Sequence, residues 1–444
     1  MVPSDLLSAV EAVRRGEWTA EELFAAYRRR VEAENPRLNA FLSLAEPPAA
    51  FPAPQTPLAG VPLAIKDLID VAGLPTTAGS PHFFGTQPAL QDAEVVRRLK
   101  LAGATILGKT HTHEIALGIT GINPHHGPAR NPHDPQRITG GSSSGSAAAV
   151  AAGLVPAALG TDTGGSVRIP AALCGVVGFK PTFGRISTRG VLPLSWNLDH
   201  VGVLTRTVAD AALLFQILAG YDPQDPVSQD VPLEDVFASL DGGVKGWQIV
   251  LAVGPYIEEA DAIVLEHVRK AAERFEALGA GVIEKEITPL HAAAQANGLM
   301  VITDAATVHR ERLAQHPEWF GEDVRQRLER GRATNVADYV LARRTQSETR
   351  RYFDLFFREF DLLLLPTTAT TAAPIEGLDS AAFAPKMTRF TAPFNLTGLP
   401  AISLPCGQDT NGLPIGVQMV AGPWQEAKLL RAAYVWEQTG ASFA

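Results

Sequence analysis

The chain contains almost no cysteine, no clustered basic run and no long uninterrupted apolar segment. Its two cysteines, Cys174 and Cys406, build neither a disulfide framework nor a metal-binding spacing. Lysine and arginine number 38 against 47 acidic residues and are scattered, which disfavours direct nucleic-acid binding. No stretch approaches the roughly 18 apolar residues of a membrane span, and the N-terminus lacks a signal-peptide core. We therefore expect a reduced, cytoplasmic protein that contacts no membrane.

Helix-like and strand-like patterns alternate along the chain. Apolar residues recur at helical spacing in segments such as 208–220, and a short apolar run such as 246–254 is typical of a buried strand. Two helices are predicted within 6–35, and Thr19 with Glu22 has the spacing of a capping box at the start of the second. The alternation predicts an α/β fold, a single large domain with a mixed, mostly parallel, twisted β-sheet flanked by helices on both faces.

The segment GATILGKT, residues 103–110, has the letters of a phosphate-binding loop. Such a loop must follow a strand and precede a helix, because the helix N-terminus meets the phosphates. Here a helical pattern precedes Gly103, the letters ATIL are strand-like themselves, and no clear helix begins after Lys109. We therefore expect a strand at this position and no nucleotide binding.

An H-x-H pair, His111 and His113, follows this strand and is compatible with a metal-dependent amidohydrolase. That site would need further ligands at later strand ends, and His200, which follows Asp199 in a loop, is at best one of them. We favour the interpretation that these histidines line a loop or a pocket wall, and keep the metal enzyme as the rival hypothesis. Among the other histidines, His125 and His126 lie shortly beyond the pair, and His267 and His309 fall within helical patterns.

Residues 138–170 form a stretch rich in serine, glycine and alanine that resembles a linker in composition. Ser142 lies in GGSSSGS near its start and Ser166 in TDTGGSVRIP near its end. The segment between them is mostly apolar, with a helix-like half and a strand-like half, which a linker would not carry. We therefore expect one folded unit with a serine-bearing turn at each end, where glycines let the backbone approach a ligand closely.

A serine hydroxyl becomes a nucleophile when a neighbouring base accepts its proton. The histidines offer no obvious Ser-His-Asp arrangement, but Lys66, at the end of the strand-like GVPLAIK, is a candidate base because burial lowers a lysine pKa by up to about 3–5 units. On spacing alone, a surface ion pair between Lys66 and Asp67 is an equally good interpretation. Three further residues, Asp162, Arg168 and Asp199, are either catalytic or tie loops together, and the structural role is the default.

Three motifs together resemble the amidase signature family. They are GVPLAIKDLID, then GGSSSGSAAAVAAGLVPAALGTDTGGSVRIPAALCGVVGFKPT, then the closing pair GLPAISLPCG and LPIGVQMVAG. The likeness runs from about residue 58 to the C-terminus, and the middle motif is too long to be a chance match. The resemblance implies the amidase signature fold, with N-terminal helices and a loop at 1–57, a catalytic core at 58–210 and a variable substrate-side region at 255–368.

The resemblance also implies a Ser-cisSer-Lys triad. Ser166 falls on the nucleophile, Ser142 on the bridging serine, with a cis peptide bond at Gly141–Ser142, and Lys66 on the base. A small amide would be hydrolysed through an acyl-enzyme, with no metal or organic cofactor. The further implied residues are the oxyanion-hole N–H groups around Thr163, Gly164, Gly165 and Ser166, the loop-holding pair Asp162 and Arg168, and Gly118, Ile119, Thr120 and Gly121 beside the leaving group.

The family includes stand-alone amidases and the glutaminase subunit of a tRNA-dependent amidotransferase. This chain has GKTHTHEIALGITGINPH at 108–125, where that subunit tends to have a Met-Asp-Glu-Phe-like stretch, and it is compact between Gly254 and Phe383. Both features favour a stand-alone amidase of linear amides, and the glutaminase subunit is the alternative. The sequence does not identify the acyl group or the oligomeric state, and a homodimer is compatible with it.

Overall fold

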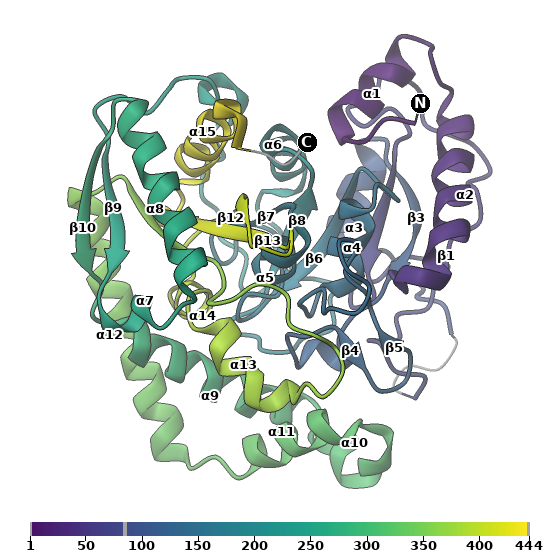
Figure 1. Ribbon diagram of the computed structural model, residues 1–444. Helices are drawn as coiled ribbons and strands as arrows, with labels where there is room; N and C mark the ends of the chain where they lie inside the picture. The colour runs from purple at the N-terminus through teal and green to yellow at the C-terminus, as the bar shows by residue number, and fades with distance from the viewer. Residues whose placement is uncertain (1, 83–86, 442–444) are drawn as a thin grey trace.

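An eleven-stranded sheet forms the centre of the computed structural model, which describes residues 2–82 and 87–441 (Figure 1). In spatial order its strands are β1 (Phe41–Leu44), β3 (Thr105–Thr110), β2 (Pro62–Lys66), β6 (Ala157–Asp162), β8 (His200–Thr205), β7 (Val177–Lys180), β12 (Ala401–Gln408), β13 (Pro414–Val420), β11 (Leu362–Pro366), β9 (Gln248–Val253) and β10 (Gly281–Glu286). A separate two-stranded ribbon pairs β4 (Ile122–Asn123) with β5 (Gly127–Pro128).

The sheet is mixed, and its parallel pairs form two groups. β3, β2 and β6 are parallel neighbours, as are β11, β9 and β10. The strands between these groups, from β8 to β13, pair antiparallel. The predicted α/β class is confirmed, while the antiparallel centre differs from the largely parallel sheet expected. A strand buried on both faces has the same continuous apolar pattern whichever way its neighbour runs, so composition did not indicate the direction.

Both faces of the sheet are covered. Along β9, Ile249 and Leu251 belong to one apolar cluster while Val250 and Ala252 belong to another, and β11 alternates in the same way. Because successive strand side chains point to opposite faces, this alternation places a packed layer on each side. One layer contains α8 (Ala262–Ala277), α6 (Val208–Leu218) and α15 (Glu426–Trp436), and the other contains α7 (Pro255–Glu258) and part of α12 (Val336–Glu359).

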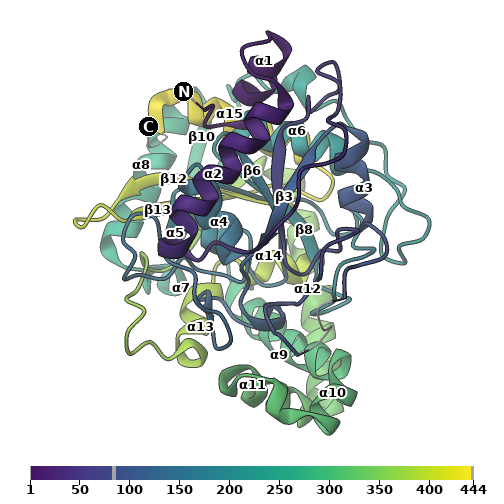
Figure 2. The same cartoon turned by 90° about the vertical axis from the view of Figure 1, so that its right-hand side faces the viewer.

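The remaining helices surround this core. Figures 1 and 2 agree that α9 to α12 gather below the sheet, where α9 packs against α11, α12 and α14. Their bounds, with those of the helices nearer the sheet, are α1 (Leu6–Arg14), α2 (Ala20–Leu38), α3 (Glu94–Leu101), α4 (Ser144–Ala151), α5 (Arg168–Cys174), α9 (Leu290–Val308), α10 (Arg310–Gln315), α11 (Glu322–Arg332), α13 (Ser380–Thr388) and α14 (Ala392–Thr397).

Two local predictions are confirmed. Thr19 and Glu22 form the expected capping box at the start of α2, since the Thr19 side chain accepts from the Glu22 N–H at 3.1 Å and the Glu22 carboxylate accepts from the Thr19 N–H at 2.8 Å. Six of the eight phosphate-loop letters, Thr105 to Thr110, form the buried strand β3 rather than a loop, and the N–H groups of Gly103 and Ala104 bond to carbonyls of α3. These backbone N–H groups are therefore engaged and do not form an anion cradle.

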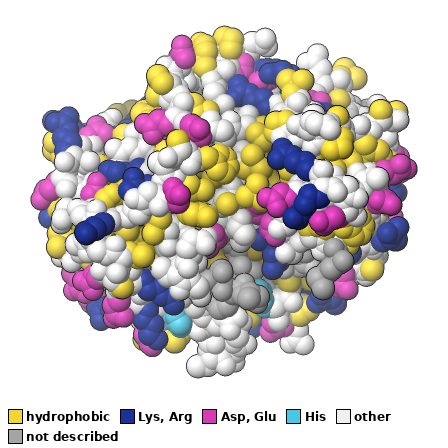
Figure 3. Space-filling view, turned by 90° about the horizontal axis from the view of Figure 1, so that it is seen from above, with side chains coloured by type: hydrophobic (Ala, Val, Ile, Leu, Met, Phe, Trp, Pro, Cys, Tyr) yellow, Lys and Arg dark blue, Asp and Glu magenta, His cyan; other side chains and the backbone are white. Residues whose placement is uncertain are grey.

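The surface shows the scattered charges that the sequence indicates. Figure 3 shows one face on which lysine and arginine side chains are interspersed with acidic ones around a central group of hydrophobic side chains. No helix in the described ranges is long and apolar enough to cross a membrane.

Candidate active site

Lys66, at the end of β2, is fully buried and meets hydroxyl groups rather than a carboxylate. Its Nζ lies 2.7 Å from Ser142 Oγ and 2.8 Å from Thr161 Oγ1. Burial lowers the pKa of Lys66 to about 7, although the more distant charges of Asp162 and Asp199 oppose that shift. Close to neutral pH a large fraction of this amine is therefore unprotonated and able to accept a proton. Thr161, at the end of β6, is a contact that the sequence reasoning missed.

The alternative of a Lys66–Asp67 surface pair is wrong. Asp67 is 1% exposed and faces the neighbouring strand, where its Oδ1 lies 3.1 Å from Lys109 Nζ. Consecutive residues at a strand end point in opposite directions, so Lys66 and Asp67 reach different partners. Asp67 also accepts a short hydrogen bond from Thr77 Oγ1.

Ser142 follows a cis peptide bond, Gly141–Ser142, as the resemblance implied. Its hydroxyl is buried and bonded to Lys66, and its carbonyl accepts from the His113 N–H at 3.2 Å. The expected pocket segment Gly118–Gly121 packs directly against Gly141, where a Cβ would lie 3.0 Å from Gly121 N. This backbone contact brings the GITG segment beside Ser142.

Ser166 lies in the loop between β6 and α5, next to the Ser142 segment. The Ser143 N–H donates to the Ser166 carbonyl at 3.2 Å, which joins the two serine-bearing turns. Ser166 is 5% exposed, and its hydroxyl forms no hydrogen bond within residues 2–82 and 87–441. Its Oγ keeps some exposure to solvent. The hydroxyl is thus free to meet a ligand.

Asp162 holds the loop that carries Ser166. Its carboxylate accepts from the N–H of Gly165 at 2.8 Å and of Val167 at 3.1 Å, and it forms a buried ion pair with Arg168 at 2.8 Å. Burial raises the pKa of Asp162, but the charge and hydrogen bonds of Arg168, with the charge of Lys180 and a hydrogen bond from Asn395, outweigh it and hold the pKa well below its usual range. Because the Gly165 N–H is engaged here, it does not point to a substrate, which differs from the expectation that it joins the oxyanion hole.

The guanidinium of Arg168 connects this loop to the C-terminal part of the chain. It donates to Gln418 Oε1 and to Asn395 Oδ1, both at 2.6 Å, and to the Thr391 carbonyl at 3.0 Å. Asn395 in turn donates to Asp162 Oδ1 at 2.8 Å. All these polar groups are buried and paired, so the loop conformation is strongly determined.

The comparisons with known proteins agree with this arrangement. The family profile for amidases matches residues 22–430. The chain belongs to the amidase family.

Its relatives include an amidase and subunits of a tRNA-dependent amidotransferase. An amidase from Pseudomonas putida is 39% identical over 98% of this chain and 95% of its own length. The A-type subunit of a glutamyl-tRNA(Gln) amidotransferase from Chloroflexus aggregans is 37% identical over 97% of this chain and 95% of its own. A crystal structure of an amidase superimposes with a TM-score of 0.86 at 37% identity, covering 98% of this chain and all 100% of the other. The amidase fold therefore extends over essentially the whole chain.

Asp199 is a second buried carboxylate, close to the loop that carries Ser166. It accepts from Thr163 Oγ1 at 2.6 Å and from the N–H groups of Leu194 and Ser195 at 2.8 and 3.1 Å. Burial raises the pKa of Asp199 to about 6. His200, the next residue, begins β8, and its Nδ1 lies 2.7 Å from the Leu198 carbonyl and 3.1 Å from that of Asp162. His200 therefore ties two loops together.

The H-x-H pair of this amidase does not converge on one point. His111 lies between the Gly127 carbonyl, 2.9 Å from Nε2, and Ser144 Oγ, 3.0 Å from Nδ1. His113 Nε2 lies 3.2 Å from Asp323 Oδ2, and its ring packs against Gly118. Burial lowers the pKa of both histidines, for His111 to about 4, so both are neutral at pH 7. Within the described ranges, no group of three or more His, Cys, Asp or Glu side chains could hold a metal ion.

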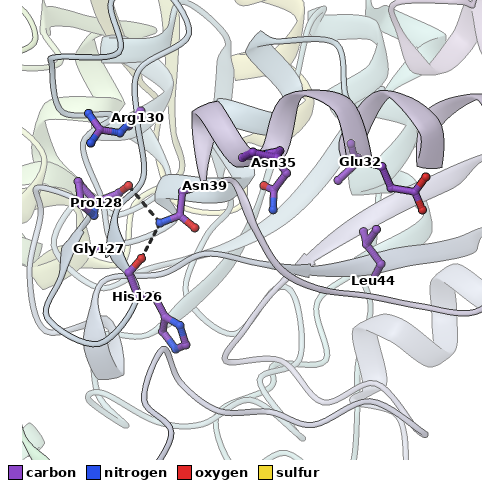
Figure 4. Close-up of a pocket in the computed structure, with 10 residues that line it drawn as sticks. Glu32, Asn35, Asn39, Leu44, His126, Gly127, Pro128 and Arg130 are labelled. Carbon is purple, nitrogen blue, oxygen red and sulfur yellow. Dashed lines mark hydrogen bonds between the residues drawn. The ribbon is translucent and has the colours of Figure 1, made fainter.

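A hollow of about 550 Å³ lies at the end of α2, beside the β4–β5 ribbon (Figure 4). Asn39, one of its lining residues, donates to the carbonyls of His126 and Pro128 at 2.8 and 3.2 Å. None of its lining residues bonds to Lys66, Ser142 or Ser166. We therefore place the candidate active site at the Lys66 cluster, where the polar groups converge, and not at this hollow.

Proposed function

We propose that this amidase hydrolyses a linear carboxylic acid amide through an acyl-enzyme on Ser166, with Ser142 passing the proton to neutral Lys66. The observation that carries the proposal is the 2.7 Å contact between Lys66 Nζ and Ser142 Oγ in a fully buried setting without a carboxylate partner. A lysine paired with a carboxylate would stay protonated, whereas burial beside hydroxyls favours the neutral amine that a base requires.

The proposed reaction begins with proton transfer. Lys66 accepts the Ser142 proton while Ser142 accepts that of Ser166, and Ser166 Oγ bonds to the amide carbon to give a tetrahedral intermediate. The C–N bond then breaks, and the proton returns along the same path to the leaving nitrogen. Water next enters, gives a proton to the relay and attacks the ester carbon. Collapse of that second intermediate releases the acid and restores the Ser166 hydroxyl.

Negative charge on the carbonyl oxygen needs donors that are already in place. The N–H groups of Gly164 and Ser166 donate to no loop carbonyl or side chain in the described part of the chain, which leaves them open for this use. Together with the Thr163 N–H they form the proposed oxyanion hole. Each such donor typically contributes about 2.7–4 kcal/mol to lowering the barrier.

The test compares two serines of the same segment. Ser166→Ala should abolish hydrolysis of a panel of small primary amides, glutamine included, and should abolish covalent acylation detected by peptide mass spectrometry. Ser146→Ala is the matched control, because its hydroxyl donates to the Leu159 carbonyl inside the core and lies outside the proposed relay. Full activity in folded Ser166→Ala protein would refute the proposal.

A second candidate function rests on the amidotransferase relatives, which match this chain over nearly its whole length. In that case the same Ser166 chemistry would release ammonia from glutamine for a partner protein. The chain would then hydrolyse glutamine slowly alone and much faster with a co-purifying protein. Comparable rates on several other amides, with no stimulation by a partner, would exclude it.

A further inference from the structure

Two side chains from distant parts of the chain hold carbonyl groups of the nucleophile loop, residues 163–167 between β6 and α5. Asn297 Nδ2, from α9, donates to the Thr163 carbonyl at 3.2 Å. Thr391 Oγ1, just before α14, donates to the Gly164 carbonyl at 2.7 Å. Asn297 is 2% exposed and Thr391 is fully buried, so water does not compete freely for these bonds.

A carbonyl that is held in place also fixes the N–H of the same peptide. The peptide unit is planar and trans, so its C=O and N–H point in opposite directions. The bond from Asn297 to the Thr163 carbonyl therefore directs the Gly164 N–H away from α9. The bond from Thr391 to the Gly164 carbonyl directs the Gly165 N–H, which in turn meets Asp162 at 2.8 Å.

The loop needs such restraints because two consecutive glycines let its peptides rotate. Gly165 has φ of +131°, a conformation that other residues rarely adopt. If the peptide between Thr163 and Gly164 turned over, a carbonyl oxygen would face the developing oxyanion in place of an N–H. Repulsion would then replace one of the strongest stabilising interactions of acyl transfer.

The two side chains approach closely because the loop residues beside them have no side chain. A Cβ on Gly165 would lie 2.2 Å from Thr391 Oγ1, and a Cβ on Gly164 would lie 3.2 Å from Asn297 Oδ1. The orientation of the Asn297 amide follows from its partner, since a carbonyl accepts only from the NH₂ side. The close approach of Asn297 and Thr391 therefore depends on the glycines at positions 164 and 165.

We infer that Asn297 and Thr391 are positioning residues for the oxyanion hole: Asn297 keeps the Gly164 N–H turned toward the substrate carbonyl oxygen, and Thr391 holds the next peptide, with its Gly165 N–H on Asp162, so that the loop cannot rotate out of this conformation. This inference rests on the proposed function of Ser166. Neither side chain takes part in proton transfer. Both act by preventing rotation of the loop peptides, so their loss should weaken binding of the transition state more than binding of the ground state.

The experiment uses side chains of matched shape. Thr391→Val and Asn297→Asp keep the volume but remove the donor, Thr391→Ser retains the donor, and Asn297→Ala is a second variant in case the new carboxylate prevents folding. Thr397→Val is the control, because that hydroxyl serves only the Pro393 carbonyl within α14. The readouts are kcat, KM and the inhibition constants of two ligands, an aldehyde analogue of a substrate and the carboxylic acid product.

We expect the donor-less variants to lose about 10- to 100-fold in kcat, with KM little changed. Aldehyde affinity should fall by a similar factor, because its adduct with Ser166 carries the oxyanion, while acid binding and Tm stay close to wild type. Thr391→Ser and Thr397→Val should resemble wild type. Wild-type kcat and aldehyde affinity in Thr391→Val and Asn297→Asp would overturn the inference, as would equal losses for aldehyde and acid.

The positioning role and the proposed function can be refuted separately. If Ser166→Ala is inactive while the donor-less variants are fully active, only the positioning role is refuted. If Ser166→Ala keeps its activity, the proposed function itself is refuted, whatever the other variants do.

Discussion

Lys66 and Lys109 occupy adjacent strands of the same sheet and are both fully buried, yet only Lys109 is paired with a carboxylate. Lys66 Nζ meets the hydroxyls of Ser142 and Thr161, whereas Lys109 Nζ lies 3.1 Å from the carboxylate of Asp67. Burial lowers the pKa of each lysine, and for Lys109 the adjacent negative charge opposes the effect directly. The comparison shows that burial alone does not make a lysine a base. The partner decides whether the ammonium is neutralised by an ion pair or by loss of its proton.

The largest expected difference comes from replacing each lysine by methionine. Lys66→Met should lower kcat/KM by about 10²–10⁴-fold, the usual contribution of a general base, and should leave the protein folded. Lys109→Met should instead lower the free energy of unfolding by about 3–5 kcal/mol, because it leaves the Asp67 carboxylate buried without its partner. Steady-state kinetics and thermal unfolding of both variants measure the contrast. Equal effects of the two substitutions on both quantities would contradict the distinction.

The second prediction concerns pH. Activity should rise as the pH passes through about 7, where Lys66 loses its proton. Stability should move in the same direction, because the folded pKa of about 7 lies below the ordinary value of 10.5 and the unfolded chain binds the proton more tightly. The Lys66 contribution to stability is thus lost as the pH falls from about 10.5 to about 7. Lys66→Met should flatten the stability profile in this window, and an unchanged slope would be inconsistent with a neutral lysine.

A smaller effect is expected from the carboxylate near Lys66. The charge of Asp199 raises the pKa of Lys66, so Asp199→Asn should move the acid side of the kcat/KM profile to lower pH. Because Asp199 also accepts from Thr163 Oγ1, the plateau rate is expected to fall as well. Asp261→Asn, a half-exposed carboxylate, is the control and should leave the profile in place. A shift to higher pH would show that Asp199 does not act on Lys66 electrostatically.

The smallest effect is expected from chelators and nucleotides. His111 and His113 contact separate partners, and most of the phosphate-loop letters lie in strand β3. Dialysis against a chelator should therefore leave kcat unchanged, and magnesium with ATP should not alter Tm. Loss of activity on chelation that zinc restores would favour the metal-dependent alternative.

The sequence predicted the elements of the site that are local in the chain. The strand before Lys66 and the two serine-bearing turns could be assigned from contiguous motifs, and the cis bond at Gly141–Ser142 was implied by the family resemblance that these motifs carry. The role of Lys109 could not, because its partner depends on the parallel register that sets Ile65 beside Lys109 and Lys66 beside Thr110. Pairing across strands is a property of the assembled sheet, and residue type alone does not reveal it.

The groups that surround the nucleophile loop were missed for a related reason. Asn297, Thr391, Asn395 and Gln418 reach the loop from segments more than a hundred residues away, and none stands in a motif that signals a buried hydrogen bond. The engagement of the Gly165 N–H by Asp162 was also not foreseen, because a glycine-rich loop indicates backbone freedom but not which N–H groups remain open.

The most direct test of the Lys66–Ser142 relay is the pH dependence of covalent labelling at Ser166. A fluorophosphonate reacts with an activated serine whatever the natural amide is, so the labelling rate reports the relay itself. We predict a single adduct on Ser166, with a labelling rate that rises through a midpoint close to pH 7 and is lost in Lys66→Met. An adduct on another residue, or a rate that is flat between about pH 5 and pH 9 and unaffected by Lys66→Met, would contradict the relay.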